Sequence, residues 1–178
     1  KINKTNNQFY RLNAQRRIYL QREAIFEELS KNDKEDWIIY SDSDEIPNLE
    51  YFKFNTCKKK VVLFNQKLFY YKFNLTLLDN SWFGSKACKL KNLKSISALR
   101  NIKPKKYGWW RLDTLFKKNK FIDLEIVENG GWHFSEVKTP EEIYKKHHND
   151  EHHDEFYLTG INLEAVKKMV QERYIYYD

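Results

Sequence analysis

The sequence predicts a single mixed α/β domain, because short apolar segments with strand composition alternate with segments of helical periodicity over residues 1–178. The 178 residues are 41% hydrophobic and 16% aromatic, which is enough material for one full hydrophobic core. No internal repeat and no low-complexity linker divides the chain. We therefore expect one globular α/β domain.

The first half of the chain predicts one helix and several strands. Apolar residues recur at helical spacing from about residue 9 to residue 30, with charged residues between them. The apolar run 37–40 predicts a short strand. The acidic run 42–47 follows it and is expected to form a turn, since its final proline has no N–H for a strand ladder. Residues 61–64 and 67–73 are rich in β-branched and aromatic side chains and predict two strands, paired antiparallel.

The second half predicts two further helices, a short helix and another strand. Residues 95–100 favour the short helix and residues 121–127 favour the strand. A turn is expected at 128–131, where adjacent glycines permit backbone angles closed to other residues. Thr139 is a good N-cap, because a proline and two glutamates follow it. The last helix is expected at about 163–172.

The chain carries a positive net charge of +7, from 32 basic and 25 acidic residues. Such a surface attracts nucleic acid, anionic lipid or a phosphorylated substrate, although a plain solvated surface is an equal alternative. Two cysteines are too few for a disulfide scaffold and favour a reducing compartment. No run reaches the roughly 18 to 20 apolar residues needed to cross a bilayer. We expect a cytoplasmic location, with association with a membrane as an alternative, and the Golgi lumen if the chain is eukaryotic.

The acidic run 42–47 (DSDEIP) is the most informative motif for function. Asp42 and Asp44 stand two residues apart at the end of a predicted buried strand, a DxD arrangement suited to a divalent cation that carries phosphate oxygens. Asp44 is the first candidate for a direct metal ligand, and Asp42 is expected to contact the metal through water or to hold a ribose. Glu45 would support them. The alternative is an acidic turn that only caps a neighbouring element.

A second motif, GWHFS at residues 131–135, combines an indole, an imidazole and a hydroxyl. Trp132 is suited to stack on a sugar or base, and His133 is suited to bind a metal or a phosphate. Taken alone, these side chains are more often part of a core. Arg22, Arg100 and Arg111 are candidates to clamp a diphosphate, since guanidinium matches phosphate geometry, and surface ion pairs are the alternative.

At these motifs the chain resembles glycosyltransferase family 17, whose eukaryotic members add the bisecting β-1,4-linked N-acetylglucosamine to N-glycans. The matching pieces occur in the family's order and are QREAI at 21–25, IIYSDSDEIP at 38–47, YKFN at 71–74, WFG at 82–84, Arg100 and GWHFS at 131–135. The family's leading strand-helix unit is missing before the first of these pieces. We therefore expect either an N-terminally truncated chain or a donor pocket that lacks that part.

The resemblance implies a GT-A-like fold, which is a Rossmann-like mixed sheet flanked by helices. It also implies an inverting transfer of a sugar from a UDP-sugar donor to a glycan or lipid-linked saccharide, with Mn²⁺ or Mg²⁺ as cofactor. The expected metal ligands are Asp42, Asp44 and His133. The expected contacts with the donor are Arg22, Asp42, Arg100 and Trp132.

An inverting transfer requires a general base that takes the proton of the acceptor hydroxyl. Candidates are Asp113, Glu128, Glu151, Asp154 and Glu155, and the sequence does not choose among them. Glu128, Asp154 and Glu155 are the predicted catalytic residues. The last two lie in a loose counterpart of the family's His-x-Glu element, after a longer spacer.

Three other interpretations stay open. His148 and His152 stand four residues apart, a spacing that can bind Zn²⁺ on one helical face. A nucleic-acid-binding domain could use the lysines for phosphates and the aromatic residues for base stacking, but no signature of a known nucleic-acid-binding module is present, so no nucleic-acid partner is expected. The third interpretation is a non-catalytic remnant of a glycosyltransferase that binds glycans.

Overall fold

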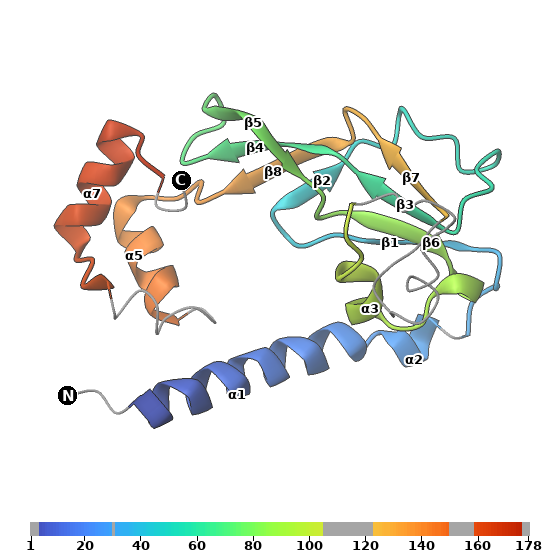
Figure 1. The fold of residues 1–178 in the computed structure, drawn as a ribbon, viewed down its shortest axis with the longest axis horizontal. Helices are drawn as coiled ribbons and strands as arrows, with labels where there is room; N and C mark the ends of the chain where they lie inside the picture. The colour runs from blue at the N-terminus through green and yellow to red at the C-terminus, as the bar shows by residue number, and fades with distance from the viewer. Residues whose placement is uncertain (1–3, 30, 105–122, 150–158, 176–178) are drawn as a thin grey trace, which may run out of the picture.

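The computed structural model describes residues 4–29, 31–104, 123–149 and 159–175. Within these ranges the chain forms two four-stranded mixed sheets flanked by helices, so the predicted α/β class is confirmed (Figure 1). The first sheet has the order β1 (Trp37–Tyr40), β6 (Lys86–Lys89), β3 (Val61–Phe64) and β7 (Leu124–Val127). The second has the order β2 (Glu45–Pro47), β8 (Gly131–Ser135), β4 (Gln66–Tyr70) and β5 (Thr76–Trp82).

Each strand of the first sheet is joined to a strand of the second by a short connection. The central strands β3 and β4 are separated only by Asn65. In the first sheet β3 pairs antiparallel with β6 and parallel with β7, whereas β4 pairs antiparallel with β5 and parallel with β8. The acidic turn between β1 and β2 lies at this junction of the sheets. Loops and strand ends from distant parts of the chain therefore meet beside it.

The predicted antiparallel pairing of 61–64 with 67–73 is wrong. One residue is too short a connection for a hairpin, so the two strands follow each other in line and find partners elsewhere. Strands β2, β5, β6 and β8 had no predicted counterpart. Most of them are short and polar-interrupted, and their pairing partners lie far away in the sequence.

The core surrounds β3, which is buried on both faces. Val61 and Leu63 face one cluster, which includes Leu99 of α3 (Ile96–Arg100). Val62 and Phe64 face the other cluster, which includes Phe52. A strand buried on both sides reads as a continuous apolar run, as 61–64 does.

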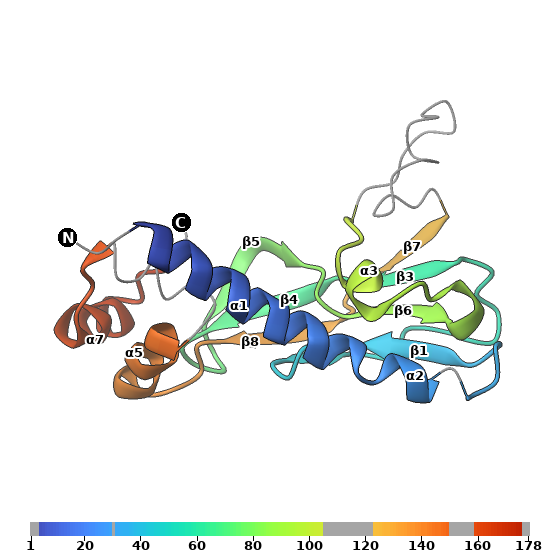
Figure 2. The ribbon, with the colours of Figure 1, turned by 90° about the horizontal axis from the view of Figure 1, so that it is seen from below.

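The predicted helix at 9–30 is two helices, α1 (Lys4–Glu23) and α2 (Phe26–Leu29). α1 runs along one side of the two sheets, and α5 (Pro140–Asn149) and α7 (Leu163–Glu172) pack together at the far end of the second sheet (Figures 1 and 2). The predicted start at Thr139 is confirmed. Its Oγ1 accepts from the N–H of Glu142 at 3.3 Å, while Glu142 accepts from the N–H of Thr139 at 3.0 Å.

Cys57 and Cys88 are both free thiols. Burial raises the pKa of the Cys88 thiol to about 12. Among the helices in the described parts of the chain, none combines the length and the apolar character that crossing a bilayer requires.

Candidate functional site

A cleft of about 830 Å³ opens where the acidic turn meets helices α1, α3 and α5 and strand β8. The side chains in its walls include Gln21, Arg22, Asp42, Asp44, Arg100, His133, Glu136, Lys146 and His147. Known small-molecule sites have volumes of about 300 to 1,000 Å³. Charged groups from five separate elements thus converge on one space that is large enough for a ligand.

Asp42 is held by three donors. Its Oδ1 accepts a hydrogen bond from the Tyr40 hydroxyl and lies 3.6 Å from a terminal nitrogen of Arg22. Its Oδ2 accepts from Nε of Arg100 at 3.1 Å and lies 3.1 Å from a terminal nitrogen of the same side chain. Burial and the bond to Asp42 raise the pKa of Tyr40 to about 12. Both carboxylate oxygens are therefore engaged in orienting two arginines at the cleft.

This geometry changes the interpretation of Asp42. As a direct metal ligand it would have to give up contacts with Arg22 or Arg100, because a carboxylate oxygen that faces a guanidinium is not open to a cation. The structure instead places Asp42 as the partner of the arginines. The proposed ribose contact would need the same oxygens.

Asp44 has a different environment from Asp42, although it is only two residues away. Its Oδ2 lies 3.4 Å from Nε2 of His133, and its side chain is 42% exposed. The contact with His133 lowers the pKa of the Asp44 carboxyl. The backbone holds the pair in place, since the N–H of Phe134 donates to the carbonyl of Asp44 at 2.9 Å. Asp44 is thus an ionised carboxylate that faces the cleft.

His133 is 9% exposed and packs against Trp82, with 4.4 Å between ring centroids. Nδ1 of His133 is buried and has no hydrogen-bond partner in the described parts of the chain. A buried polar atom without a partner costs about 1 to 3 kcal/mol and is retained where it has a role. Nε2 of His133 thus faces Asp44, whereas Nδ1 keeps an unused hydrogen-bonding position inside the fold.

Glu45 stabilises the acidic turn through two hydrogen bonds. Its Oε1 accepts from the indole N–H of Trp82 at 2.8 Å, and its Oε2 accepts from the backbone N–H of Asp42 at 3.1 Å. A Cβ at position 84 would lie 1.7 Å from Glu45 Oε1, so only glycine fits there. The WFG motif at 82–84 thus supplies both the hydrogen-bond donor for Glu45 and the room for its carboxylate.

Lys86 fixes the end of α3. Its buried ammonium donates to the backbone carbonyls of Arg100 and, at 2.7 Å, Ile102. These carbonyls follow the helix and would otherwise lack partners. Burial lowers the pKa of Lys86 to about 8. Lys86 therefore sets the backbone position from which Arg100 reaches Asp42.

Between about pH 8 and pH 9.5, the free energy of unfolding of the wild type should rise with pH more than that of Lys86→Met does. The native state releases the Lys86 proton near pH 8, whereas the unfolded chain keeps it up to the ordinary pKa of 10.5. The unfolded state therefore binds more protons in this window, which favours the native state as pH rises. Urea unfolding of both proteins across the window measures the difference. A difference that does not change with pH would contradict the assignment.

The structure brings together five of the predicted site residues, Arg22, Asp42, Asp44, Arg100 and His133. It does not bring Trp132 to them. Successive residues of a strand face opposite sides, so Trp132 points away from the face of β8 that carries His133, and it is 38% exposed.

Glu128 also lies away from the cleft. It accepts a hydrogen bond from the Asn65 amide at 2.6 Å and lines a separate hollow of about 570 Å³. It cannot act as a base at the acidic turn from there. Arg111, Asp113, Glu151, Asp154 and Glu155 lie outside the described residues.

The zinc interpretation needs both His148 and His152, and the structure describes only His148. Nδ1 of His148 lies 3.0 Å from the carbonyl of Tyr144, and His152 lies outside the described residues. Sequence patterns did not single out Lys86 or Glu136. Glu136 directly follows GWHFS, and that position at the end of a functional motif was the one signal available.

In the described parts of the chain, no three His, Cys, Asp or Glu side chains are arranged to hold an ion. Asp44 and His133 nevertheless suit two neighbouring positions of an octahedral ion. Ligands at right angles, each about 2.1 Å from Mg²⁺, stand about 3 Å apart, and these two atoms are 3.4 Å apart. An ion there would take its other ligands from water and phosphate oxygens, as Mg²⁺ commonly does.

We compared the chain with protein-family models, with curated proteins and with solved structures, and none of the three comparisons found a match.

Proposed function

We propose that this chain is a metal-dependent glycosyltransferase with a GT-A-like fold. In this proposal the cleft binds the diphosphate of a UDP-sugar with Mn²⁺ or Mg²⁺, and the sugar passes with inversion to a glycan or lipid-linked saccharide. N-acetylglucosamine is the sugar that the family 17 resemblance suggests. The observation that carries the proposal is the convergence of Asp44, His133, Arg22 and Arg100 on one cleft.

Asp44 and His133 are the residues proposed to hold the cation. Their Oδ2 and Nε2 atoms are 3.4 Å apart, and both residues line the cleft. A bound cation supplies Lewis-acid stabilisation of the negative charge that develops on the departing diphosphate. The low pKa of Asp44 keeps this carboxylate ionised at neutral pH, which a ligand for a hard cation requires.

Arg22 and Arg100 are proposed to contact the diphosphate oxygens. Guanidinium groups match phosphate in geometry and stay charged at all physiological pH values. Because Asp42 holds both of them, their positions are set before a ligand arrives. Such preorganisation lowers the cost of binding, since fewer side-chain rotamers are lost.

The proposal is tested by titrating the protein with UDP in Mn²⁺, in Mg²⁺ and in EDTA, using isothermal calorimetry. We expect UDP binding in Mn²⁺ and an affinity at least about tenfold weaker in EDTA, which is about 1.4 kcal/mol, because Asp44 and His133 would hold a cation that neutralises phosphate charge. Hydrolysis of a panel of UDP-sugars in Mn²⁺ then identifies the donor. Equal UDP affinity in Mn²⁺ and EDTA would remove the metal from the proposal.

A further inference from the structure

Glu136 is placed in the cleft by an unusual backbone conformation. On β8 the side chains of His133 and Ser135 face the cleft, so regular alternation would turn residue 136 to the opposite side. Glu136 has φ of 54°, in the left-handed region that a non-glycine residue rarely adopts. The alternation breaks at this point and Glu136 also lines the cleft. Strain of this kind costs about 1 to 3 kcal/mol and gathers at functional sites.

The carboxylate of Glu136 is buried and only partly satisfied. Its side chain is 5% exposed. Oε1 accepts from the ammonium of Lys146 at 2.7 Å and lies 3.6 Å from Nε2 of His147. Oε2 is buried and has no hydrogen-bond partner in the described ranges. Since a buried charge with an empty acceptor position is costly, the arrangement points to a ligand that donates a hydrogen bond.

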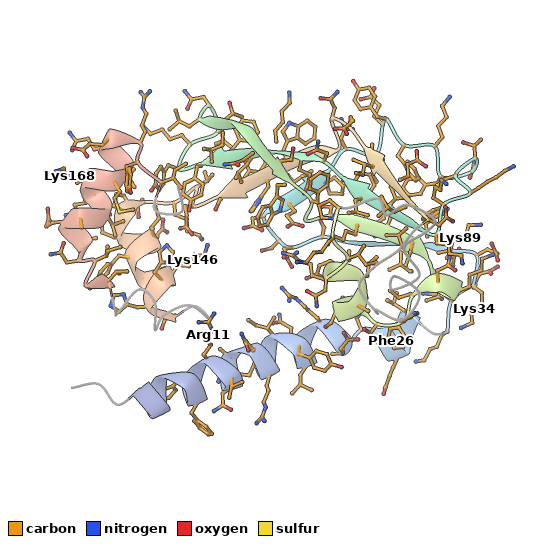
Figure 3. All side chains as sticks on the ribbon, viewed as in Figure 1. Arg11, Phe26, Lys34, Lys89, Lys146 and Lys168 are labelled. Carbon is orange, nitrogen blue, oxygen red and sulfur yellow. The ribbon has the colours of Figure 1, made fainter. Side chains whose placement is uncertain are left out.

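The basic side chains beside Glu136 come from the inner face of α5. Lys146 and His147 follow the buried Ile143 by three and four residues, so all three lie on one side of the helix. Lys146 extends from α5 toward the middle of the molecule (Figure 3). The cluster therefore forms a wall of the same cleft that Asp44 and the arginines line.

We infer that Glu136, with Lys146 and His147, forms the site for the acceptor saccharide and that Glu136 is the general base of the transfer. This inference rests on the proposed function, because it assigns the second substrate of the same cleft. A saccharide hydroxyl supplies the hydrogen bond that Glu136 lacks. The ammonium of Lys146, on a side chain that is 37% exposed, can turn toward solvent, which would open Oε1 of the same carboxylate to the cleft.

In the transfer step, the acceptor oxygen attacks the anomeric carbon of the donor sugar and its proton passes to the Glu136 carboxylate. The bond between that carbon and the diphosphate oxygen breaks, and the diphosphate leaves with the electron pair. Glu136 then returns the proton to solvent. A positioned base of this kind contributes about 10² to 10⁴ in rate.

The test compares Glu136→Gln with the wild type in three measurements. These are UDP binding in Mn²⁺, binding to an array of defined oligosaccharides with terminal mannose, galactose or N-acetylglucosamine in the presence of UDP, and transfer from radiolabelled UDP-N-acetylglucosamine to the saccharides that bind. We expect unchanged UDP affinity, saccharide binding within about threefold, and transfer reduced at least about a hundredfold. Glu136→Asp, which keeps a carboxylate, should retain more transfer than Glu136→Gln.

Two further variants separate a base from a structural residue. Glu141→Gln changes an exposed glutamate on α5, the helix that carries Lys146, and should leave transfer unchanged. Lys146→Met removes the ion pair but keeps the carboxylate. If it lowered transfer as much as Glu136→Gln does while saccharide binding stayed at the wild-type level, Glu136 would act only by holding α5 and the inference would be overturned.

The inference and the proposed function fail in different ways. Transfer by Glu136→Gln at the wild-type rate, or a wild type that binds UDP in Mn²⁺ but retains no saccharide on the array, would overturn the acceptor site and leave the donor site standing. A wild type that does not bind UDP in Mn²⁺ would overturn the proposed function itself.

Discussion

Asp44→Asn should weaken UDP binding in Mn²⁺ by about a hundredfold and abolish the difference between Mn²⁺ and EDTA. The amide keeps the size of the side chain but removes the negative charge that a hard cation requires. The low pKa of Asp44 means that this charge is present at neutral pH in the wild type. Calorimetric titration of the variant with UDP, in Mn²⁺ and in EDTA, measures the effect.

Asp42→Asn is the informative comparison, because it changes the other carboxylate of the same motif. It should weaken UDP binding by about tenfold in Mn²⁺ and in EDTA alike, since Asp42 holds Arg22 and Arg100 rather than the ion. Asp123→Asn, at an exposed carboxylate paired with Lys59, should bind UDP like the wild type. If Asp42→Asn removed the metal response and Asp44→Asn did not, the two roles would have to be exchanged.

Gly131→Ala should lower the free energy of unfolding by about 3 kcal/mol or more. Gly131 has φ of 128°, which residues with a Cβ rarely adopt, and an added Cβ would lie 2.0 Å from the carbonyl oxygen of Ile46. That oxygen belongs to strand β2, which pairs with β8 and cannot move away without breaking the pairing. Urea unfolding followed by tryptophan fluorescence measures the loss.

Gly160→Ala provides a matched control for the cost of placing a residue with a Cβ at positive φ. Gly160 has φ of 66°, but no atom lies within 4 Å of the position of an added Cβ. We expect a loss of only about 1 kcal/mol there. If both variants lost the same free energy of unfolding, the contact between the added Cβ and the Ile46 carbonyl would contribute nothing and the prediction would be wrong. That approach also positions the site, since β8 carries His133 and binds the carbonyl of Asp44 through the N–H of Phe134.

Much of the site could be predicted, because its parts are short motifs with local chemistry. The apolar run 37–40 does form a strand, and Asp42 and Asp44 do stand on the turn that follows it. His133 was singled out from GWHFS and lies beside Asp44. Trp132 was singled out from the same motif and faces the other way, since strand alternation separates neighbours and that strand had not been predicted.

The sequence pattern could not predict that Asp42 and Asp44 have different roles. Asp42 and Asp44 are equivalent as two carboxylates spaced by one residue. They differ only because Arg100, 58 residues after Asp42, reaches one of them and His133 reaches the other. The predicted bases were Glu128, Asp154 and Glu155, whereas the buried cleft carboxylate with an unpartnered oxygen in the described residues is Glu136.

By itself the sequence determined the α/β class, the strand before the acidic turn and the helix start at Thr139. These features follow from hydrophobic period and from hydrogen bonds between residues a few positions apart. Only the tertiary structure decided which carboxylate meets an imidazole, which meets two guanidinium groups, and which is left buried with an empty acceptor position. Those outcomes depend on contacts between segments far apart in the chain, and no local sequence pattern predicts which distant side chain will contact a given carboxylate.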